Sequence, residues 1–134
     1  MKENDRYQKG LKTRSEVLGK AHVDRATARA TDFDREFQQQ ITEYCWNDVW
    51  NRPGLDRKTR SMLNIAMLAA LGRDEEFKLH VRASKNTGVT RDEVKEILMQ
   101  VSIYAGVPAA NAAFRMAREV FEQADRETQS ACSN

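Results

Sequence analysis

Apolar side chains recur every three or four residues along most of the chain, which is the period of a helix with one buried face. The period is clearest from Thr31 onward, at Phe33, Phe37, Ile41, Tyr44, Cys45 and Val49. The segment 56–71 is apolar most of the way round, so we expect it to be the central and most buried helix. No segment shows the two-residue alternation of a β-strand. The sequence therefore predicts an all-α fold of about six helices.

Helix caps and helix breakers set the expected boundaries in the first half of the chain. Gly19 interrupts a first helical segment over residues 11–29. Thr31 or Asp32 can cap the second helix, because both side chains accept hydrogen bonds from free backbone N–H groups. The dipeptide Pro53-Gly54 predicts a turn that ends this helix.

The second half of the chain carries equally clear boundary signals. Asp74 opens a helix that we expect Gly88 to close in the left-handed conformation. Thr90 and Glu93 form a capping box for the next helix. Pro108 fits the first turn of a last helix, since its missing N–H group is not needed there.

Length and composition narrow the class of protein. The 134 residues suffice for a single domain, whose core we place at about residues 10–122, before a polar and disordered tail over residues 125–134. Twenty-two basic against 20 acidic side chains leave a net charge of +2, too small to indicate nucleic-acid binding. No run of about 18 apolar residues could span a membrane, and no secretory signal is visible, so we expect a cytoplasmic protein. With two cysteines and no metal-binding motif, neither a disulfide scaffold nor a metal site is expected.

His80 is the strongest candidate for acid–base chemistry. It follows Glu76 by one helical turn, so the two side chains can share a face, and an imidazole exchanges protons near neutral pH. The alternative is a hydrogen-bonded structural histidine, which the residues alone favour. His22 is a weaker candidate, because an exposed histidine on a charged helix explains it equally well.

Several cations surround the expected start of the helix 56–71, in the run Arg52-Pro-Gly-Leu-Asp-Arg57-Lys58-Thr-Arg60. Free amides at a helix N-terminus and guanidinium groups both bind anions, so the run is a candidate site for a small anion. A solvated basic rim is the alternative. It is favoured for Lys58 more than for Arg60, which borders the apolar stretch.

Four segments of the chain together carry a family signature. They are Gly10-Leu-Lys-Thr-Arg14-Ser-Glu-Val-Leu-Gly19-Lys-Ala-His22-Val-Asp-Arg25, Arg52-Pro-Gly-Leu-Asp-Arg-Lys-Thr-Arg60-Ser, His80-Val-Arg-Ala and Tyr104-Ala-Gly-Val-Pro-Ala-Ala110. In this order they resemble the carboxymuconolactone decarboxylase family, over about residues 10–122. The resemblance implies an alkylhydroperoxidase D-like helical fold and a homo-oligomer, a trimer or a hexamer.

The wider superfamily includes peroxidases with the signature Cys-x-x-Cys-x-x-x-His and an upstream glutamate. Aligning that histidine with His80 places Arg73 and Glu76 at the cysteine positions and Ser61 at the glutamate. Three of the four peroxidase groups are therefore missing, which argues against peroxidase activity. It also favours a catalytic role for His80 over a structural one.

The resemblance implies decarboxylation of 4-carboxymuconolactone to β-ketoadipate enol-lactone, in the breakdown of protocatechuate. This small substrate carries two carboxylates. Its lactone carbonyl accepts the electrons that the departing carboxyl group leaves behind, so the reaction needs neither a cofactor nor a metal. The protein must hold the dianion, stabilise negative charge on the lactone oxygen and deliver a proton to the α-carbon.

Seven side chains are candidates for these tasks. For substrate binding they are Arg60 and Arg14, with Arg57 and Arg73 in reserve. We expect His80 to donate the proton, Glu76 to orient it, and His22 to stabilise the oxyanion or bind a carboxylate.

Two alternatives to this function stay open. The first is a divergent relative that processes another small acid or lactone, since Ala105 stands where similar decarboxylases usually have cysteine. The second is a non-catalytic oligomeric binding module, in which His80 and Arg60 would be dispensable.

Overall fold

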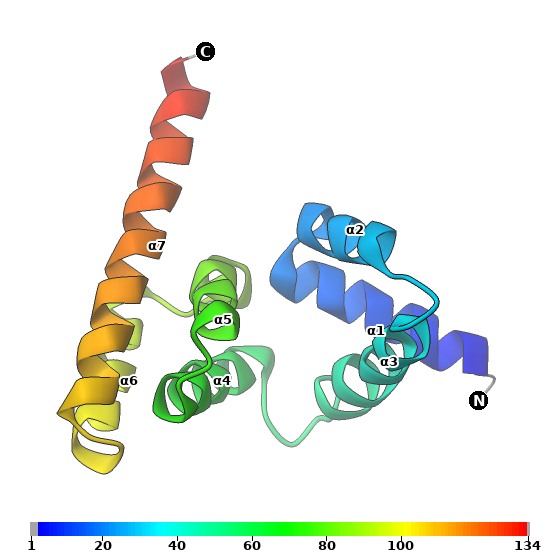
Figure 1. Cartoon of the computed structure of the whole chain (residues 1–134), viewed down its shortest axis with the longest axis horizontal. Coiled ribbons are helices and arrows are strands. Elements are labelled where there is room, and N and C mark those ends of the chain that lie inside the picture. Colours follow the sequence, from blue (N-terminus) through cyan, green and yellow to red (C-terminus); the bar gives the residue numbers. More distant parts are fainter. Residues whose placement is uncertain (1–2, 134) are drawn as a thin grey trace. The chain divides into compact units, whose positions relative to one another are not determined.

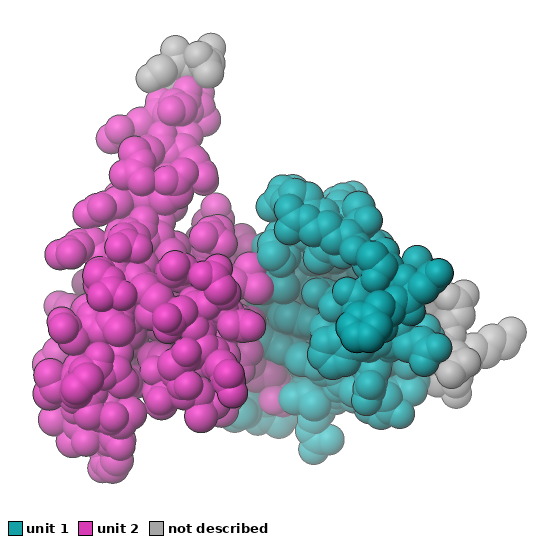
Figure 2. All heavy atoms as spheres, viewed as in Figure 1, with its two compact units in different colours: residues 1–57 teal, residues 58–134 magenta. Residues whose placement is uncertain are grey.

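A computed structural model describes residues 3–133, which form seven α-helices and one π-helix (Figure 1). They are α1 (Glu3–Leu18), α2 (Lys20–Arg29), α3 (Arg35–Ile41), the π-helix η1 (Thr42–Val49), α4 (Arg57–Leu71), α5 (Asp74–Thr87), α6 (Arg91–Tyr104) and α7 (Val107–Ser133). No strand occurs in this part of the chain, which confirms the all-α class. The chain divides into two compact units, residues 1–57 and residues 58–134 (Figure 2). The single domain expected over all 134 residues stays a prediction.

The N-terminal unit is built on the packing of α1 against η1, with α2 and α3 beside them (Figure 1). Its buried apolar residues include Val17 and Val23, on either side of the break between α1 and α2. The indole rings of Trp46 and Trp50 are also buried and stack, with their centroids 5.0 Å apart and their planes at 17°. Trp46 belongs to η1 and Trp50 follows it directly, so the end of η1 contributes this aromatic pair to the core.

The backbones of α1 and η1 meet at Gly10. A Cβ atom at this position would lie 2.0 Å from the carbonyl oxygen of Thr42 and 2.9 Å from its carbonyl carbon. Real Cβ atoms do not come so close to backbone, so this helix contact requires glycine. On the same face of α1, the Thr13 hydroxyl donates a 2.9 Å hydrogen bond to the side-chain oxygen of Asn51.

The C-terminal unit encloses an apolar core among its four helices, in which Ile65, Phe77 and Leu98 are fully buried. Helices α5 and α6 both pack on α7 (Figure 1). Gly88 ends α5 with a φ of 86°, and Thr90 and Glu93 form the capping box of α6, as the sequence predicts. The signals at the end of α5 and the start of α6 are therefore confirmed.

Helix α4 differs from the expectation. It buries Ser61, Ile65 and Ala69, but it exposes Leu63, Met67 and Leu71, the last with 68% of its surface accessible. The prediction of a central and most buried helix is therefore wrong for this chain. Apolar residues on several faces of a helix indicate that each face favours burial. They do not show that the same chain buries every face.

Two further boundaries are corrected by the structure. The helix expected from Thr31 begins only at Arg35, because the Asp34 carboxylate accepts a hydrogen bond from the Thr31 backbone N–H and holds a turn there. Neither Thr31 nor Asp32 caps it. At Thr42 the helix then widens into η1, which the three- and four-residue spacing did not predict.

The polar tail over residues 125–134 was expected to be disordered, yet α7 continues through Ser133. No glycine or proline follows Pro108, so nothing in the sequence stops the helix. Side chains one turn apart also support it, since Gln123 bonds both Arg126 and Glu127. Position 134 lies outside the described residues.

Replacing Gly10 with alanine tests the contact between α1 and η1. The added Cβ would meet backbone atoms that cannot rotate away, so we expect Gly10→Ala to lower the free energy of unfolding by at least about 2 kcal/mol. Urea unfolding followed by circular dichroism measures this. Gly54→Ala is the control, because nothing lies within 4 Å of its Cβ position, and its effect should stay within about 0.5 kcal/mol. Equal stability of the two variants would contradict the close approach.

Candidate functional site

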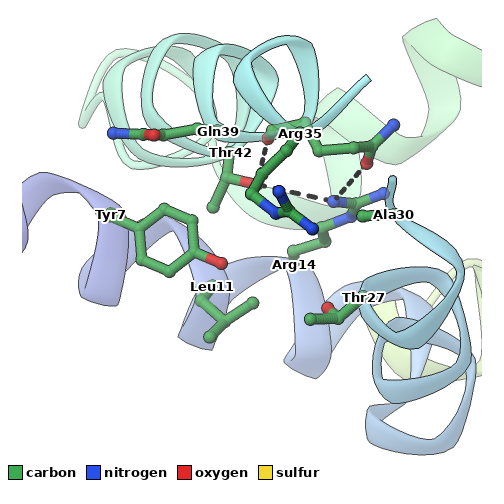
Figure 3. Close-up of a pocket in the computed structure, with 9 residues that line it drawn as sticks. Tyr7, Leu11, Arg14, Thr27, Ala30, Arg35, Gln39 and Thr42 are labelled. Atoms are coloured by element: carbon green, nitrogen blue, oxygen red, sulfur yellow. Dashed lines mark hydrogen bonds between the residues drawn. The ribbon is translucent and has the colours of Figure 1, made fainter. Parts of the chain in front are cut away.

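The N-terminal unit contains a pocket of about 530 Å³ between its helices (Figure 3). Its lining residues come from α1, α2, α3, η1 and the α2–α3 connection, and are Tyr7, Leu11, Arg14, Thr27, Ala30, Arg35, Gln38, Gln39 and Thr42. The pocket thus combines two guanidinium groups with neutral polar side chains and a small apolar surface. Such a lining suits a small organic anion.

Arg14 is the predicted site residue that lies in this pocket. Its Nη1 donates hydrogen bonds to Gln38 Oε1 at 3.3 Å and to Thr42 Oγ1 at 3.4 Å (Figure 3). Its Nε is buried and has no hydrogen-bond partner among the residues that the structure describes. Burial lowers the pKa of this guanidinium, while the nearby Cys45 and Tyr7 act in the opposite direction.

The partners of Arg14 are neutral, and both hydrogen bonds are long. Within the described part of the chain, no carboxylate forms an ion pair with it. Removing a cation from water without a counter-ion is unfavourable, and guanidinium stays charged at any physiological pH. The pocket therefore has an electrostatic preference for an anion, and a carboxylate matches the guanidinium geometry.

Two residues that the sequence did not single out share this pocket. Arg35 directs its guanidinium toward the same space as Arg14 (Figure 3), and it forms an ion pair with Asp32. Tyr7 turns its hydroxyl toward the middle of the pocket (Figure 3). Neither belongs to a cationic run or a motif, so only the fold shows that they accompany Arg14.

His80 lies in α5 and is 8% exposed. Burial lowers its pKa from 6.5 to about 4, and the negative charge of Glu76 opposes this only in part. The influence of Glu76 agrees with the shared helix face that their spacing predicts. At neutral pH the imidazole is therefore uncharged, which limits the chemistry that it can perform.

The remaining candidates lie as follows. His22 is half-buried in α2, Arg60 is half-buried in α4, and Arg73 is exposed at the start of α5. Arg57 donates to Glu16 at 2.7 Å, within the N-terminal unit. Lys58 pairs with Glu93 at 2.9 Å, within the C-terminal unit. Two cations of the expected anion-binding run thus have carboxylate partners inside the protein.

No group of three or more His, Cys, Asp or Glu side chains in the described part is arranged to hold a metal ion. None of the helices between residues 3 and 133 is both long and apolar enough to cross a membrane.

Comparison with known proteins agrees with the motifs. Residues 35–119 match the carboxymuconolactone decarboxylase family. Over 122 residues the chain is 51% identical to the 4-carboxymuconolactone decarboxylase of Acinetobacter baylyi, and the match covers 91% of each protein. It is 41% identical to the nitrosuccinic acid decarboxylase npaB of Metarhizium robertsii over 103 residues, which are 77% of this chain and 72% of that protein. A 4-carboxymuconolactone decarboxylase sequence of Pseudomonas putida is 46% identical over 48 residues, 36% of this chain and all of that sequence.

The family match crosses the boundary between the two units and includes His80, but it begins after Arg14. The longer match to the Acinetobacter baylyi protein leaves only 12 residues of this chain uncovered, so it includes Arg14 as well. These matches confirm the resemblance that the four sequence segments indicate. The chain belongs to the carboxymuconolactone decarboxylase family.

Proposed function

We propose that the protein decarboxylates 4-carboxymuconolactone to β-ketoadipate enol-lactone. The observation that carries this proposal is the 51% identity to a relative of that name over 91% of both proteins. The cationic pocket around Arg14 supports it, because the substrate is a small dianion.

The chemistry follows from the substrate. One carboxylate sits on the ring carbon next to the ring oxygen, and an acetate arm on the same carbon carries the other. When the ring carboxylate leaves as carbon dioxide, its bonding electrons move through the ring alkene into the lactone carbonyl. The oxyanion so formed collapses as one proton, ultimately from solvent, adds to the α-carbon. The enzyme has to bind the dianion and stabilise this oxyanion more strongly than the substrate carbonyl.

Arginines bind the substrate carboxylates in this scheme. Arg14 is the first choice, because its guanidinium lies in a pocket and its hydrogen-bond partners among the described residues are neutral. Arg60 is retained as a second candidate, and Arg73 as a reserve. Arg57 is the weakest of the four, because Glu16 already pairs with it.

The pKa of His80 changes the role that we assign to it. With a pKa of about 4, only roughly one imidazole in a thousand carries a second proton at pH 7, so His80 is a poor proton donor. A neutral imidazole still donates a hydrogen bond through its N–H group. We therefore assign His80 to the developing lactone oxyanion, where one such donor contributes about 100-fold or more to the rate. Glu76 is a positioning residue for His80, and His22 remains a candidate for the second carboxylate.

A different small acid is the second candidate substrate, because a relative at 41% identity is named for nitrosuccinic acid. Nitrosuccinic acid is also a dicarboxylic acid, and its nitro group accepts electrons as the lactone carbonyl does. Turnover of both compounds should be compared, and a preference of this chain for nitrosuccinate would replace the lactone in the proposal.

The setting of the enzyme is part of the proposal. We expect a cytoplasmic homo-oligomer, a trimer or a hexamer. The exposed side chains of Leu63, Met67 and Leu71 on α4 support assembly, because an apolar helix face on a protein surface favours association.

Substitutions of His80 test both the reaction and the assigned role. Wild-type protein should consume enzymatically prepared 4-carboxymuconolactone, followed by its ultraviolet absorbance. His80→Ala should lower kcat at least about tenfold, because it removes an oxyanion donor. His80→Gln should lower kcat less than His80→Ala does, since the glutamine amide also donates a neutral hydrogen bond. A glutamine variant as inactive as the alanine variant would instead favour proton donation, and an unchanged kcat in both would remove His80 from the site.

The pKa of His80 also predicts how stability depends on pH. The unfolded chain protonates this histidine near its ordinary pKa of 6.5 and the folded chain only near 4, so between these values protons favour unfolding. The free energy of unfolding should therefore fall as the pH is lowered from about 6.5 to about 4, by up to about 1.4 kcal/mol per pH unit. Denaturant titrations at several pH values measure this slope.

His80→Gln is the control for the stability measurement, because it has no titrating group. It keeps the carboxylates whose pKa is lowered by hydrogen bonds. These bonds come from Arg6 to Asp48, from Arg91 to Asp125, and from the Thr90 backbone and Lys58 to Glu93. The difference between the two slopes then belongs to His80. Identical slopes would show that the imidazole is not buried in its neutral form.

A further inference from the structure

The pocket of the N-terminal unit raises the question of which substrate carboxylate it takes. The two carboxylates differ, because one leaves as carbon dioxide while the acetate carboxylate stays on the product. The guanidinium of Arg14 is held by the neutral side chains of Gln38 and Thr42, so it presents a fixed positive charge to the pocket, whereas Asp32 partly compensates the charge of Arg35. A fixed positive charge changes the reaction rate differently at the two carboxylates.

An arginine bound to the departing carboxylate would slow the reaction. The negative charge of that group moves away into the lactone ring as the carbon–carbon bond breaks. A guanidinium beside it would therefore stabilise the substrate more than the transition state, which raises the barrier. The acetate carboxylate keeps its charge throughout, so an arginine bound to it holds the substrate at no cost to the rate.

We propose that the pocket lined by Arg14, Arg35 and Tyr7 binds the acetate carboxylate, the one that the substrate retains. This inference rests on the proposed function. It adds Arg35 and Tyr7 to the substrate-binding residues and gives the pocket a role in specificity rather than in bond breaking.

The rest of the lining agrees with this occupant. The side chains of Leu11 and Ala30 provide apolar surface for the methylene group of the acetate arm. Gln39 and Thr27 supply polar groups at the wall without adding negative charge. The Tyr7 hydroxyl, which points into the pocket, can donate to a carboxylate oxygen (Figure 3).

Two saturated lactones separate the carboxylates experimentally. The γ-lactone of β-hydroxyadipate keeps the ring and the acetate arm but lacks the ring carboxylate. The γ-lactone of α-hydroxyglutarate keeps the ring carboxylate but lacks the acetate arm. The affinity of each is measured by calorimetry on the full-length protein, so that no turnover is needed.

Arg14→Met is the test variant, because it removes the charge but keeps an unbranched stem in the half-buried position. We expect it to weaken binding of the first lactone at least about tenfold and to leave the second unchanged. With 4-carboxymuconolactone it should raise KM by a similar factor while kcat is kept, as for a contact made equally in substrate and transition state. Arg35→Ala should lower the affinity for the first lactone by a smaller factor, since Arg35 is exposed to solvent. Its replacement should leave the rest of the pocket unchanged.

Lys12→Ala is the matched control, because it removes a cation from the same helix at an exposed position that does not line the pocket. It should leave both affinities unchanged. The assignment would be overturned if Arg14→Met weakened binding of the second lactone alone. It would also be overturned if both arginine variants bound both lactones as tightly as the wild-type protein does. A fall in kcat at unchanged KM would do the same. Failure of the wild-type protein to decarboxylate 4-carboxymuconolactone would instead contradict the proposed function, whatever the two lactones show.

Discussion

The backbones of α1 and η1 touch at Gly10, and the position of Arg14 depends on this contact. Arg14 follows Gly10 by one helical turn, so it lies on the same face of α1 and reaches the side chain of Thr42. A larger residue at position 10 would hold the helix away from Thr42, and water could then surround the guanidinium. The absence of a side chain at Gly10 thus determines how deeply the guanidinium of Arg14 is buried.

Burial acts in the same direction on the two central candidates, but with different results. It lowers the pKa of both Arg14 and His80. Because the pKa of guanidinium starts so high, Arg14 stays positive, whereas His80 becomes neutral at physiological pH. The protein thereby offers one group that is charged without a counter-ion and one that is polar without charge. These are the properties that a dianion and a developing oxyanion respectively require.

Much of the fold could be predicted from local signals. Gly88, Thr90 and Glu93 act within one turn of their own backbone, so their effect is readable from spacing alone. The resemblance to the family was also readable, since its motifs are local. The widening of the helix at Thr42 was not, because an apolar period of three to four residues describes both helix types.

The composition of the pocket lay beyond the sequence for a similar reason. Arg14 was identified from its motif, but Arg35 and Tyr7 meet it only through the packing of both α1 and α3 on η1. The pKa of His80 depends on how deeply the fold buries it, which its spacing from Glu76 does not reveal, so the spacing suggested a proton donor that the fold makes neutral. The cations at 52–60 looked free because their partners, such as Glu16 and Glu93, are far along the chain.

The stacked indoles of Trp46 and Trp50 have a practical consequence. They are the two tryptophans of the whole chain, and both belong to the N-terminal unit. Intrinsic fluorescence excited at the indole band therefore reports on that unit alone, whereas helical ellipticity reports on both. The two tryptophans therefore serve as an intrinsic fluorescent probe of the unit that contains the arginine pocket. Comparing thermal unfolding by fluorescence with that by circular dichroism distinguishes the two units without an added dye.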